Sequence, residues 1–150
     1  MPGTSIDIVV NTPPKVIYEV VADFESYPEF LPDAKKVVIE SSNGKGMTAS
    51  FEIKVIKTIH YSLQFKFQPS KKLTWTFVKG DLFKNNVGSW EFEEIKKGQT
   101  KATYSVEVDF GLFIPKAIIN MLVGSNLPAM MERFKKRAES LHKPGSGKGS

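Results

Sequence analysis

Alternation of hydrophobic and polar residues near the start of the chain predicts a first strand over Ser5 to Asn11, with one largely apolar face. Directly after it, apolar residues recur at helical spacing on one side: Ile17, Val20, Val21 and Phe24. This spacing predicts a helix, with Thr12 as its cap and Pro13 in its first helical position. The aromatic, proline-broken segment Tyr27 to Pro32 cannot continue that helix, so one more turn and then a lid-like loop are expected.

From Lys35 onward the hydrophobic period changes to two, which is typical of β-strands. The expected strands are Lys36 to Glu40, Met47 to Lys57, Ile59 to Gln68, Lys72 to Lys79, Gly88 to Ile95 and Lys101 to Phe110. Turn-forming residues separate them at Ser42 to Gly46, Pro69 to Lys71, Asn85 to Asn86 and Lys97 to Gln99. Because consecutive strands have such short links, antiparallel pairing is predicted.

The two faces of this predicted sheet differ in character. One collects bulky apolar side chains: Phe51, Ile53, Val55, Tyr61, Leu63, Phe65, Phe67, Leu73, Trp75, Phe77, Trp90, Phe92, Tyr104, Val106, Val108 and Phe110. The other face is polar: Glu52, Lys54, His60, Gln64, Lys66, Thr74, Thr76, Glu91, Glu93, Thr103, Ser105, Glu107 and Asp109. We expect water on the polar face and a covering layer on the apolar one.

The end of the chain supplies a cover of suitable length. An apolar helix is predicted from Pro115 to Val123, with an interruption at Gly124 to Pro128. The restarted helix has an apolar stripe made of Leu127, Met130, Met131, Phe134, Ala138 and Leu141. Residues Pro144 to Ser150 have no periodicity, so we expect a domain over 1–143 and then a disordered tail or a cloning remnant. The predicted fold class is α+β.

Composition narrows the classes of protein. A chain of 150 residues with 41% hydrophobic residues fits one domain with its own core. The lack of cysteine excludes disulfides, thiolate metal sites and a cysteine nucleophile. The formal charge is +5, yet only Arg133 and Arg137 among the 21 basic residues are arginines, which argues against specific nucleic-acid recognition. With no membrane-spanning apolar run and no signal-peptide pattern, we expect a cytoplasmic protein, with peripheral membrane contact as a further possibility.

Candidate catalytic and metal-binding residues are scarce. His60 falls on the polar face and His142 near the end of the last helix, so neither a catalytic pair nor a zinc site is predicted. No convergent acid and base are found, and we expect neither an enzyme nor a cofactor. Tyr61 and Tyr104 are the best candidates for polar groups on the apolar face, since a phenol offers one hydrogen bond on an apolar body. Alternatively, and equally well, the hydroxyls of Tyr61 and Tyr104 could reach solvent at the rim of the sheet.

Two stretches carry a family resemblance. Val21 to Pro32, VADFESYPEFLP, resembles the segment after the first helix in the coenzyme Q-binding START-like family. Gly80 to Phe92, GDLFKNNVGSWEF, is similar to a Gly-x-x-Phe-Lys to Gly-x-Trp-x-Phe stretch of that family. The chain therefore resembles the START-like superfamily, also called SRPBCC or polyketide cyclase/dehydrase, over roughly Ser5 to Leu141. The resemblance implies a helix-grip fold, a curved sheet of about six to seven strands around a long C-terminal helix, with an apolar cavity between them.

A ligand-binding site follows from the resemblance together with the apolar face. Its predicted lining is Phe30, Phe51, Ile53, Val55, Tyr61, Leu63, Phe65, Trp75, Phe77, Trp90, Phe92, Tyr104, Val106, Phe113, Ile118, Leu122, Met130 and Phe134. The predicted function is the carrying or chaperoning of a polyprenyl quinone or similar lipid. A mouth is expected at Phe30 to Pro32, Phe83 and Gly111 to Pro115, where Lys84 and Lys116 could contact an anionic membrane.

Three alternatives stay open at this point. The aromatic residues could simply fill a core, as most buried aromatic residues do. The basic surface, with Lys135, Lys136 and Arg137 as first candidates, could associate with ribosomes in the manner of the toxin members of the superfamily. Third, the chain could be an aromatase/cyclase that folds a polyketide, although its apolar face offers only tyrosines as proton-transfer groups.

Overall fold

The computed structural model describes residues 3–43, 46–54, 58–81, 83–110, 116–117 and 127–142. Seven strands form one antiparallel sheet in the order β1-β7-β6-β5-β4-β3-β2. Their bounds are Gly3–Val10 (β1), Ala34–Asn43 (β2), Gly46–Lys54 (β3), Thr58–Gln68 (β4), Lys72–Gly80 (β5), Phe83–Lys96 (β6) and Gln99–Phe110 (β7). The helices are α1 (Pro14–Ala22), the 3-10 helix η1 (Phe24–Glu29) and α3 (Leu127–Leu141). The predicted α+β class and the antiparallel pairing are confirmed.

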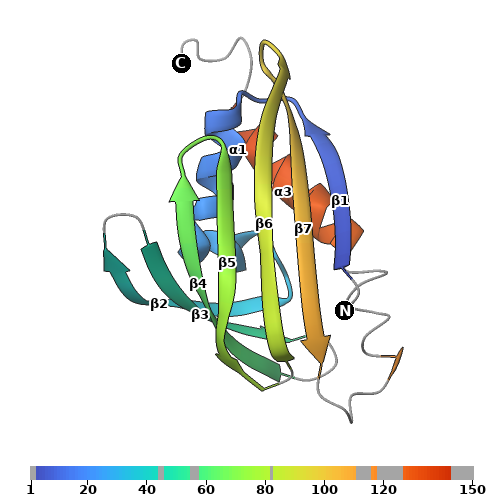
Figure 1. Cartoon of the computed structure of the whole chain (residues 1–150). Helices are drawn as coiled ribbons and strands as arrows, with labels where there is room; N and C mark the ends of the chain where they lie inside the picture. Colours follow the sequence, from blue (N-terminus) through green and yellow to red (C-terminus); the bar gives the residue numbers. More distant parts are fainter. Residues whose placement is uncertain are drawn as a thin grey trace.

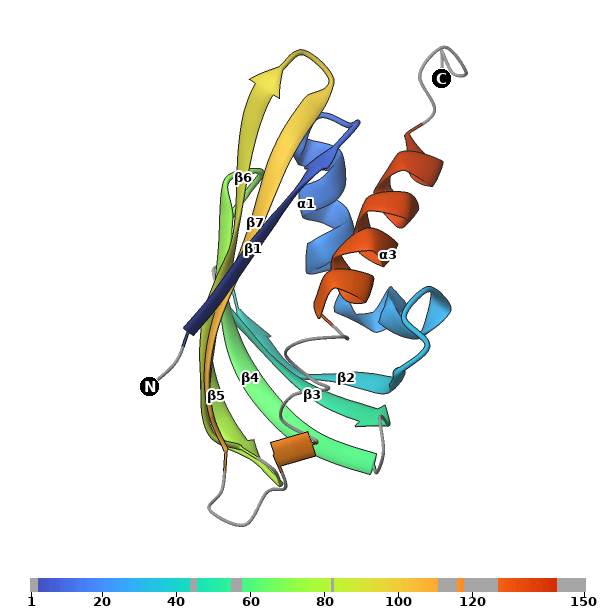
Figure 2. The same cartoon turned by 90° about the vertical axis from the view of Figure 1, so that its right-hand side faces the viewer.

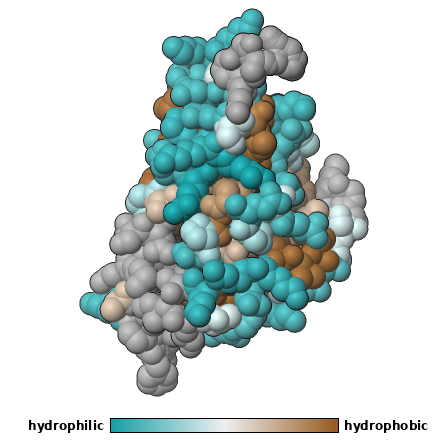
Figure 3. Space-filling view, turned by 180° about the vertical axis from the view of Figure 1, so that it is seen from behind, coloured by the Kyte–Doolittle hydropathy of each residue, from teal (hydrophilic) through white to brown (hydrophobic). Residues whose placement is uncertain are grey.

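The sheet is curved, and both α-helices lie on its concave side (Figures 1 and 2). In Figure 2 the strands β2, β3 and β4 bend beneath α3, while β1, β6 and β7 stand beside α1 and α3. The helical side of the molecule is predominantly hydrophilic on its surface, with hydrophobic surface in separate smaller areas (Figure 3). This arrangement is the predicted helix-grip architecture, with the apolar face of the sheet turned toward the helices.

Two local predictions were wrong at the start of α1 and in β6. The N-cap of α1 is Pro13 and the helix begins at Pro14, because Pro13 precedes another proline and has an extended backbone; the Thr12 hydroxyl donates to Pro13 O and makes no cap. The Asn85–Asn86 pair forms no turn; both residues lie inside β6, where they pair with Asp109 and Val108. The side chain of Asn86 has a buried partner that sequence patterns do not reveal.

The helix α3 confirms that the segment with the predicted apolar stripe is helical, and its buried residues are Met131, Phe134 and Ala138. Leu141 was expected in the same stripe but is 63% exposed, because it is the last residue of the helix. Of the predicted helix from Pro115 to Val123, only 116–117 belong to the described residues, and they are helical. Val55 to Lys57 at the end of one predicted strand and the tail from residue 143 lie outside the described part.

A dense core fills the space between the sheet and the helices at one end of the fold. Its fully buried residues include Val10, Ile17, Val21, Ala102 and Ala138, from β1, α1, β7 and α3. Burying each of the larger side chains among them, those of Val10, Ile17 and Val21, contributes about 1.5–3 kcal/mol. This end of the fold is therefore held by ordinary close packing.

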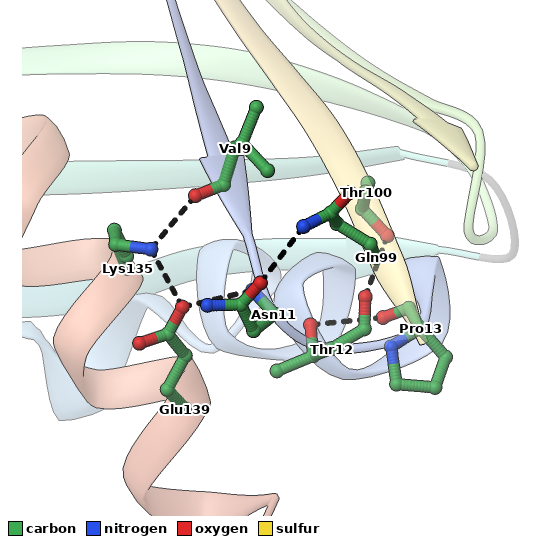
Figure 4. Close-up of polar contacts among 8 residues, drawn as sticks. All are labelled: Val9, Asn11, Thr12, Pro13, Gln99, Thr100, Lys135 and Glu139. Carbon is green, nitrogen blue, oxygen red and sulfur yellow. Dashed lines mark hydrogen bonds and ion pairs between the residues drawn. The ribbon is translucent and has the colours of Figure 1, made fainter. Parts of the chain in front are cut away.

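Polar contacts fasten α3 to the β1–α1 connection at the same end (Figure 4). Lys135 Nζ donates to Val9 O at 2.8 Å and lies 2.7 Å from Glu139 Oε2. The backbone N–H of Asn11 donates to Glu139 Oε2 at 2.8 Å, and Gln99 Nε2 donates to Asn11 Oδ1 at 3.0 Å. These contacts join three segments that are far apart in the sequence, so the position of α3 over the sheet is fixed at its C-terminal half.

Candidate ligand cavity

A cavity of about 420 Å³ lies between the concave face of the sheet and the N-terminal half of α3. Its lining is mainly apolar and aromatic: Phe24, Tyr27, Leu31, Pro32, Asp33, Ala34, Phe51, Ile53, Tyr61, Leu63, Phe65, Leu73, Trp75, Asn86, Trp90, Tyr104, Val106, Val108, Phe110, Leu127, Ala129, Met130, Arg133 and Phe134. A volume of this size is in the range of pockets that hold small molecules.

Aromatic rings in mutual contact make up much of the wall. Trp90 lies 5.1 Å from Phe134 and 5.3 Å from Tyr104 between ring centroids, and Trp75 lies 5.5 Å from Tyr104. On the other side of the cavity Phe24 packs on Phe65 at 4.2 Å. Because each ring is held by the next, the walls cannot easily move inward to fill the space between them.

The cavity has a closed end and an exposed rim. Along β7 the lining runs from Phe110 through Val108 and Val106 to Tyr104, beyond which Ala102 is fully buried against the core. The exposed lining residues are Pro32, Asp33, Ala129 and Arg133, from the turn before β2 and the first turns of α3. A guest would therefore enter between that turn and α3, with its far end toward Tyr104.

Most polar groups in the wall already have protein partners. Trp75 Nε1 donates to Asn86 Oδ1 at 2.9 Å, and both side chains are buried. Tyr27 Oη donates to Val21 O at 2.5 Å. These two bonds remove two donors from the cavity and orient the Trp75 and Tyr27 rings along its wall.

The tyrosines of the cavity are neutral near neutral pH. Burial raises the pKa of Tyr61 to about 12, and burial followed by the charge of Tyr61 raises the pKa of Tyr104 further. Burial also raises the pKa of Tyr27 well above its usual range, with additions from Tyr104, Tyr61 and Asp23. All three phenols thus stay protonated and act as hydrogen-bond donors or acceptors, not as bases.

Gly88 makes room for one of the tryptophans. A Cβ atom at this position in β6 would lie 2.4 Å from Trp75 Cζ2 and 2.4 Å from the backbone oxygen of Ser105. Both distances are far below van der Waals contact. Only glycine therefore lets the Trp75 ring approach β6 this closely, which explains the glycine two residues before Trp90.

The predicted lining residues fall into three groups. Those that line the cavity are Phe51, Ile53, Tyr61, Leu63, Phe65, Trp75, Trp90, Tyr104, Val106, Met130 and Phe134. Three others lie elsewhere: Phe30, Phe77 and Phe92. Outside the described residues are Val55, Phe113, Ile118 and Leu122. Contact of any of these residues with a guest stays a prediction.

Two of these three residues, Phe30 and Phe92, have other aromatic partners. Phe30 packs edge-on against Phe134 at 5.2 Å and lies under the Arg137 guanidinium at 5.1 Å. Phe92 stacks on Trp90 at 6.0 Å and meets Tyr18 of α1 at 5.9 Å. Phe92 thus fills the core end of the fold. The alternation of residues along a strand does not distinguish a core residue from one that lines a cavity.

Several lining residues were not predicted as site residues. Phe24 and Tyr27 come from the segment assigned to a helix and its extra turn, and Leu31 from the expected mouth. Asn86 was assigned to a turn, and Arg133 was considered for its charge. The aromatic spacing of Phe24 and Tyr27 could have indicated an inward face, whereas nothing in the sequence separates Asn86 from its turn-like neighbour.

A second hollow, on the polar face of the sheet, has different chemistry. It includes Lys36, Glu52, His60, Lys79 and Asp81 in its lining. His60 Nδ1 lies 3.2 Å from Asp81 Oδ2, and its Nε2 lies 3.5 Å from Glu52 Oε1, with the imidazole 60% exposed. In the part of the chain that the structure describes, no group of three or more His, Cys, Asp or Glu side chains is arranged to hold a metal ion.

The fold and its cavity can now be compared with known proteins. Residues 10–135 match the family described as polyketide cyclase / dehydrase and lipid transport. The chain belongs to this family. The predicted START-like membership is thereby confirmed, while the nearer resemblance to the coenzyme Q-binding branch stays a prediction.

Proteins similar to this chain have diverse descriptions. The ribosome association toxin RatA of Escherichia coli K12 is 23% identical over 146 residues, covering 95% of this chain and 90% of the toxin. The Zhui aromatase/cyclase from Streptomyces sp. R1128 superposes with a TM-score of 0.85 at 13% identity, covering 96% of this chain and 98% of that one. A START superfamily protein from Mycobacterium smegmatis gives a TM-score of 0.82 at 17% identity, covering 93% and 98%. At these identities the solved structures establish the shared fold alone.

Proposed function

We propose that this protein binds a hydrophobic small molecule in the cavity and carries or chaperones it, with a polyprenyl quinone or another lipid as the guest. The observation that carries the proposal is a mainly apolar cavity of about 420 Å³, rich in aromatic side chains, on the concave face of the sheet. The family description, which includes lipid transport, supports the same function.

Apolar burial would supply most of the affinity. Each CH₂ group moved from water into such a site contributes about 0.8 kcal/mol, so a guest with a short prenyl or acyl segment gains several kcal/mol. No covalent or charged anchor is needed for binding of this kind. The protein could therefore release its guest to a membrane, where the guest is equally well solvated.

The ionisable groups of the lining favour binding over catalysis. Of the described lining residues, Asp33 and Arg133 lie exposed at the rim, and the tyrosines inside keep their protons. General acid–base chemistry requires a group that changes protonation near the working pH at the reacting centre. An aromatase/cyclase activity like that named for the Zhui protein would need such a group, so we favour a carrier.

Delivery from a membrane is part of the proposal. The described part of the chain contains no helix long and apolar enough to span a bilayer. Lys84 is exposed near the start of β6, which pairs with the end of β7 that lines the cavity, and Lys116 is exposed as well. An anionic surface attracts each such lysine by about 1 kcal/mol, enough to orient the protein without anchoring it.

Ribosome association is the second candidate, because the relative RatA bears that description over nearly the whole chain. The structure weakens the surface first suggested for it. Lys135 is bound to Val9 O and Glu139, and Arg137 lies 2.6 Å from Glu29 Oε1. Of the three basic residues, Lys136 is the exposed one without such a contact among the described residues.

Filling the cavity tests the proposal directly. Val106→Trp places a large ring in the cavity from β7, whereas Glu107→Trp adds the same ring on the opposite, exposed face one residue later. We expect native mass spectrometry with added prenyl quinones and phospholipids to show a one-to-one complex for the parent and Glu107→Trp, but not for Val106→Trp. Val108→Phe is the milder variant should Val106→Trp unfold. Equal binding by all folded variants, or salt-dependent binding to ribosomes in place of any guest, would contradict the carrier function.

A further inference from the structure

We infer that the guest is a neutral ring compound carrying a carbonyl oxygen, and that it binds with this oxygen at the closed end of the cavity, on the hydroxyl of Tyr104. The inference rests on the proposed binding function and adds the chemical class and the orientation of the guest. It separates carbonyl-bearing ring compounds from lipids with a charged headgroup.

Tyr104 lies where the deepest part of a guest would lie. Among the lining residues of β7 it lies farthest from Phe110, and the next inward-facing residue toward the core, Ala102, is fully buried. The rings of Trp75 and Trp90 flank it at 5.5 and 5.3 Å. A flat, π-rich ring packs well against such walls, both face-on and edge-on.

The Tyr104 hydroxyl is a donor that the described residues of the cavity leave unused. The Trp75 N–H is taken by Asn86 and the Tyr27 hydroxyl by Val21 O, whereas Tyr104 makes no hydrogen bond within the described part of the chain. Among those same residues, no sealed side-chain nitrogen or oxygen lacks a partner. The Tyr104 oxygen therefore faces the cavity and not the packed core.

A donor at a closed apolar end selects a neutral acceptor. The phenol stays protonated because burial raises its pKa, so it offers an O–H to the guest. The charged side chains of the described lining, Asp33 and Arg133, are at the rim. A carboxylate or phosphate driven to the closed end would lose its water without meeting a cation, which is far more costly than burying one hydrogen-bonded carbonyl.

Three probes with related skeletons test both parts of the inference. They are a long-chain alkyl phenyl ketone, the alkylbenzene with the same carbon skeleton, and a long-chain fatty acid. The protein has two tryptophans, and both lie beside Tyr104, so a change in the intensity or wavelength of their fluorescence reports a guest at the closed end. Affinity is measured for the parent, Tyr104→Phe and the control Tyr18→Phe, which removes a phenol from α1 outside the lining.

We expect Tyr104→Phe to lower the affinity for the ketone about five- to ten-fold, which is the effect of one hydrogen bond. The affinity for the alkylbenzene should not change. Tyr18→Phe should change neither. If Tyr104→Phe changes the affinities for the ketone and the alkylbenzene equally, the inferred hydrogen bond between Tyr104 and the carbonyl oxygen is wrong. Tighter binding of the fatty acid than of the ketone, lost in Arg133→Gln, would overturn the orientation by placing the polar end at the rim. If none of the probes binds the parent protein, the proposed function itself fails.

Discussion

The buried pair Trp75 and Asn86 provides the sharpest test of how the cavity wall is built. Its hydrogen bond, 2.9 Å from Trp75 Nε1 to Asn86 Oδ1, joins neighbouring strands β5 and β6 inside the apolar lining. Asn86→Ala removes the acceptor and leaves the indole N–H facing the cavity. The cost of an unsatisfied buried donor is about 1–3 kcal/mol, so we expect a loss of about 2 kcal/mol in the free energy of unfolding.

Urea unfolding followed by circular dichroism measures this loss. With a slope of about 2 kcal/mol per molar urea for a small domain, the midpoint should fall by about 1 M. Asn85→Ala is the matched control, because this neighbour in β6 has no side-chain hydrogen bond to the described residues. Its midpoint should stay within the experimental scatter of the parent.

A double-mutant cycle isolates the hydrogen bond from the change in packing. Trp75→Phe removes the donor, so Asn86→Ala in that background should cost about 1 kcal/mol less than in the parent. Equal costs of Asn86→Ala in both backgrounds would refute the reasoning. They would show that Asn86 matters by filling space and not by accepting from the indole.

Three further predictions concern the core, the helix anchor and the tyrosines. Gly88→Ala should lower stability by about 1–3 kcal/mol and shift the tryptophan emission, because the added methyl group meets Trp75 and the Ser105 backbone at 2.4 Å; an unchanged melting temperature would contradict the close approach. Burial alone would raise the pKa of Glu139, but hydrogen bonds from Lys135 and Asn11 and the charge of Lys135 lower it below the ordinary 4.5. Its stabilising contribution is therefore present above that ordinary value and lost as the pH falls through the lower folded value, so urea midpoints of Glu139→Gln should fall less steeply with acid than those of the parent. In an ultraviolet titration, all four tyrosines of the folded protein should ionise above their usual pKa of 10.0, while the protein in denaturant should titrate at the ordinary value; a folded phenolate signal at the ordinary pH would contradict the burial of the phenols.

The architecture could be predicted from the sequence because period and turn chemistry agree along most of the chain. The alternation over Ile59 to Gln68 and Lys101 to Phe110 placed β4 and β7 within two residues of their observed bounds. The error at Asn85 and Asn86 has a physical cause. Asparagine favours turns by local hydrogen bonds, but here a buried indole N–H from another strand binds Asn86 instead.

The site was predictable only in part, for a related reason. Alternation indicates which side chains point to the concave face, but not whether a helix covers them or leaves a space. Phe92 and Trp90 share that face and differ in role, since Tyr18 of α1 packs on Phe92 while Trp90 reaches the cavity. Phe24 and Tyr27 line the cavity because the chain folds η1 against it, which the pattern along the sequence does not reveal.

The division of the concave face into a packed half and an open half explains how a fold of this size tolerates a cavity. No residue of the network in Figure 4, which includes Asn11, Lys135 and Glu139, lines the cavity, and the fully buried core residues Ile17, Val21 and Ala138 do not line it either. Part of the free energy that holds α3 over the sheet therefore comes from contacts outside the site. Substitutions in the lining can thus alter binding at moderate cost to folding, which fits one architecture serving relatives with such different descriptions.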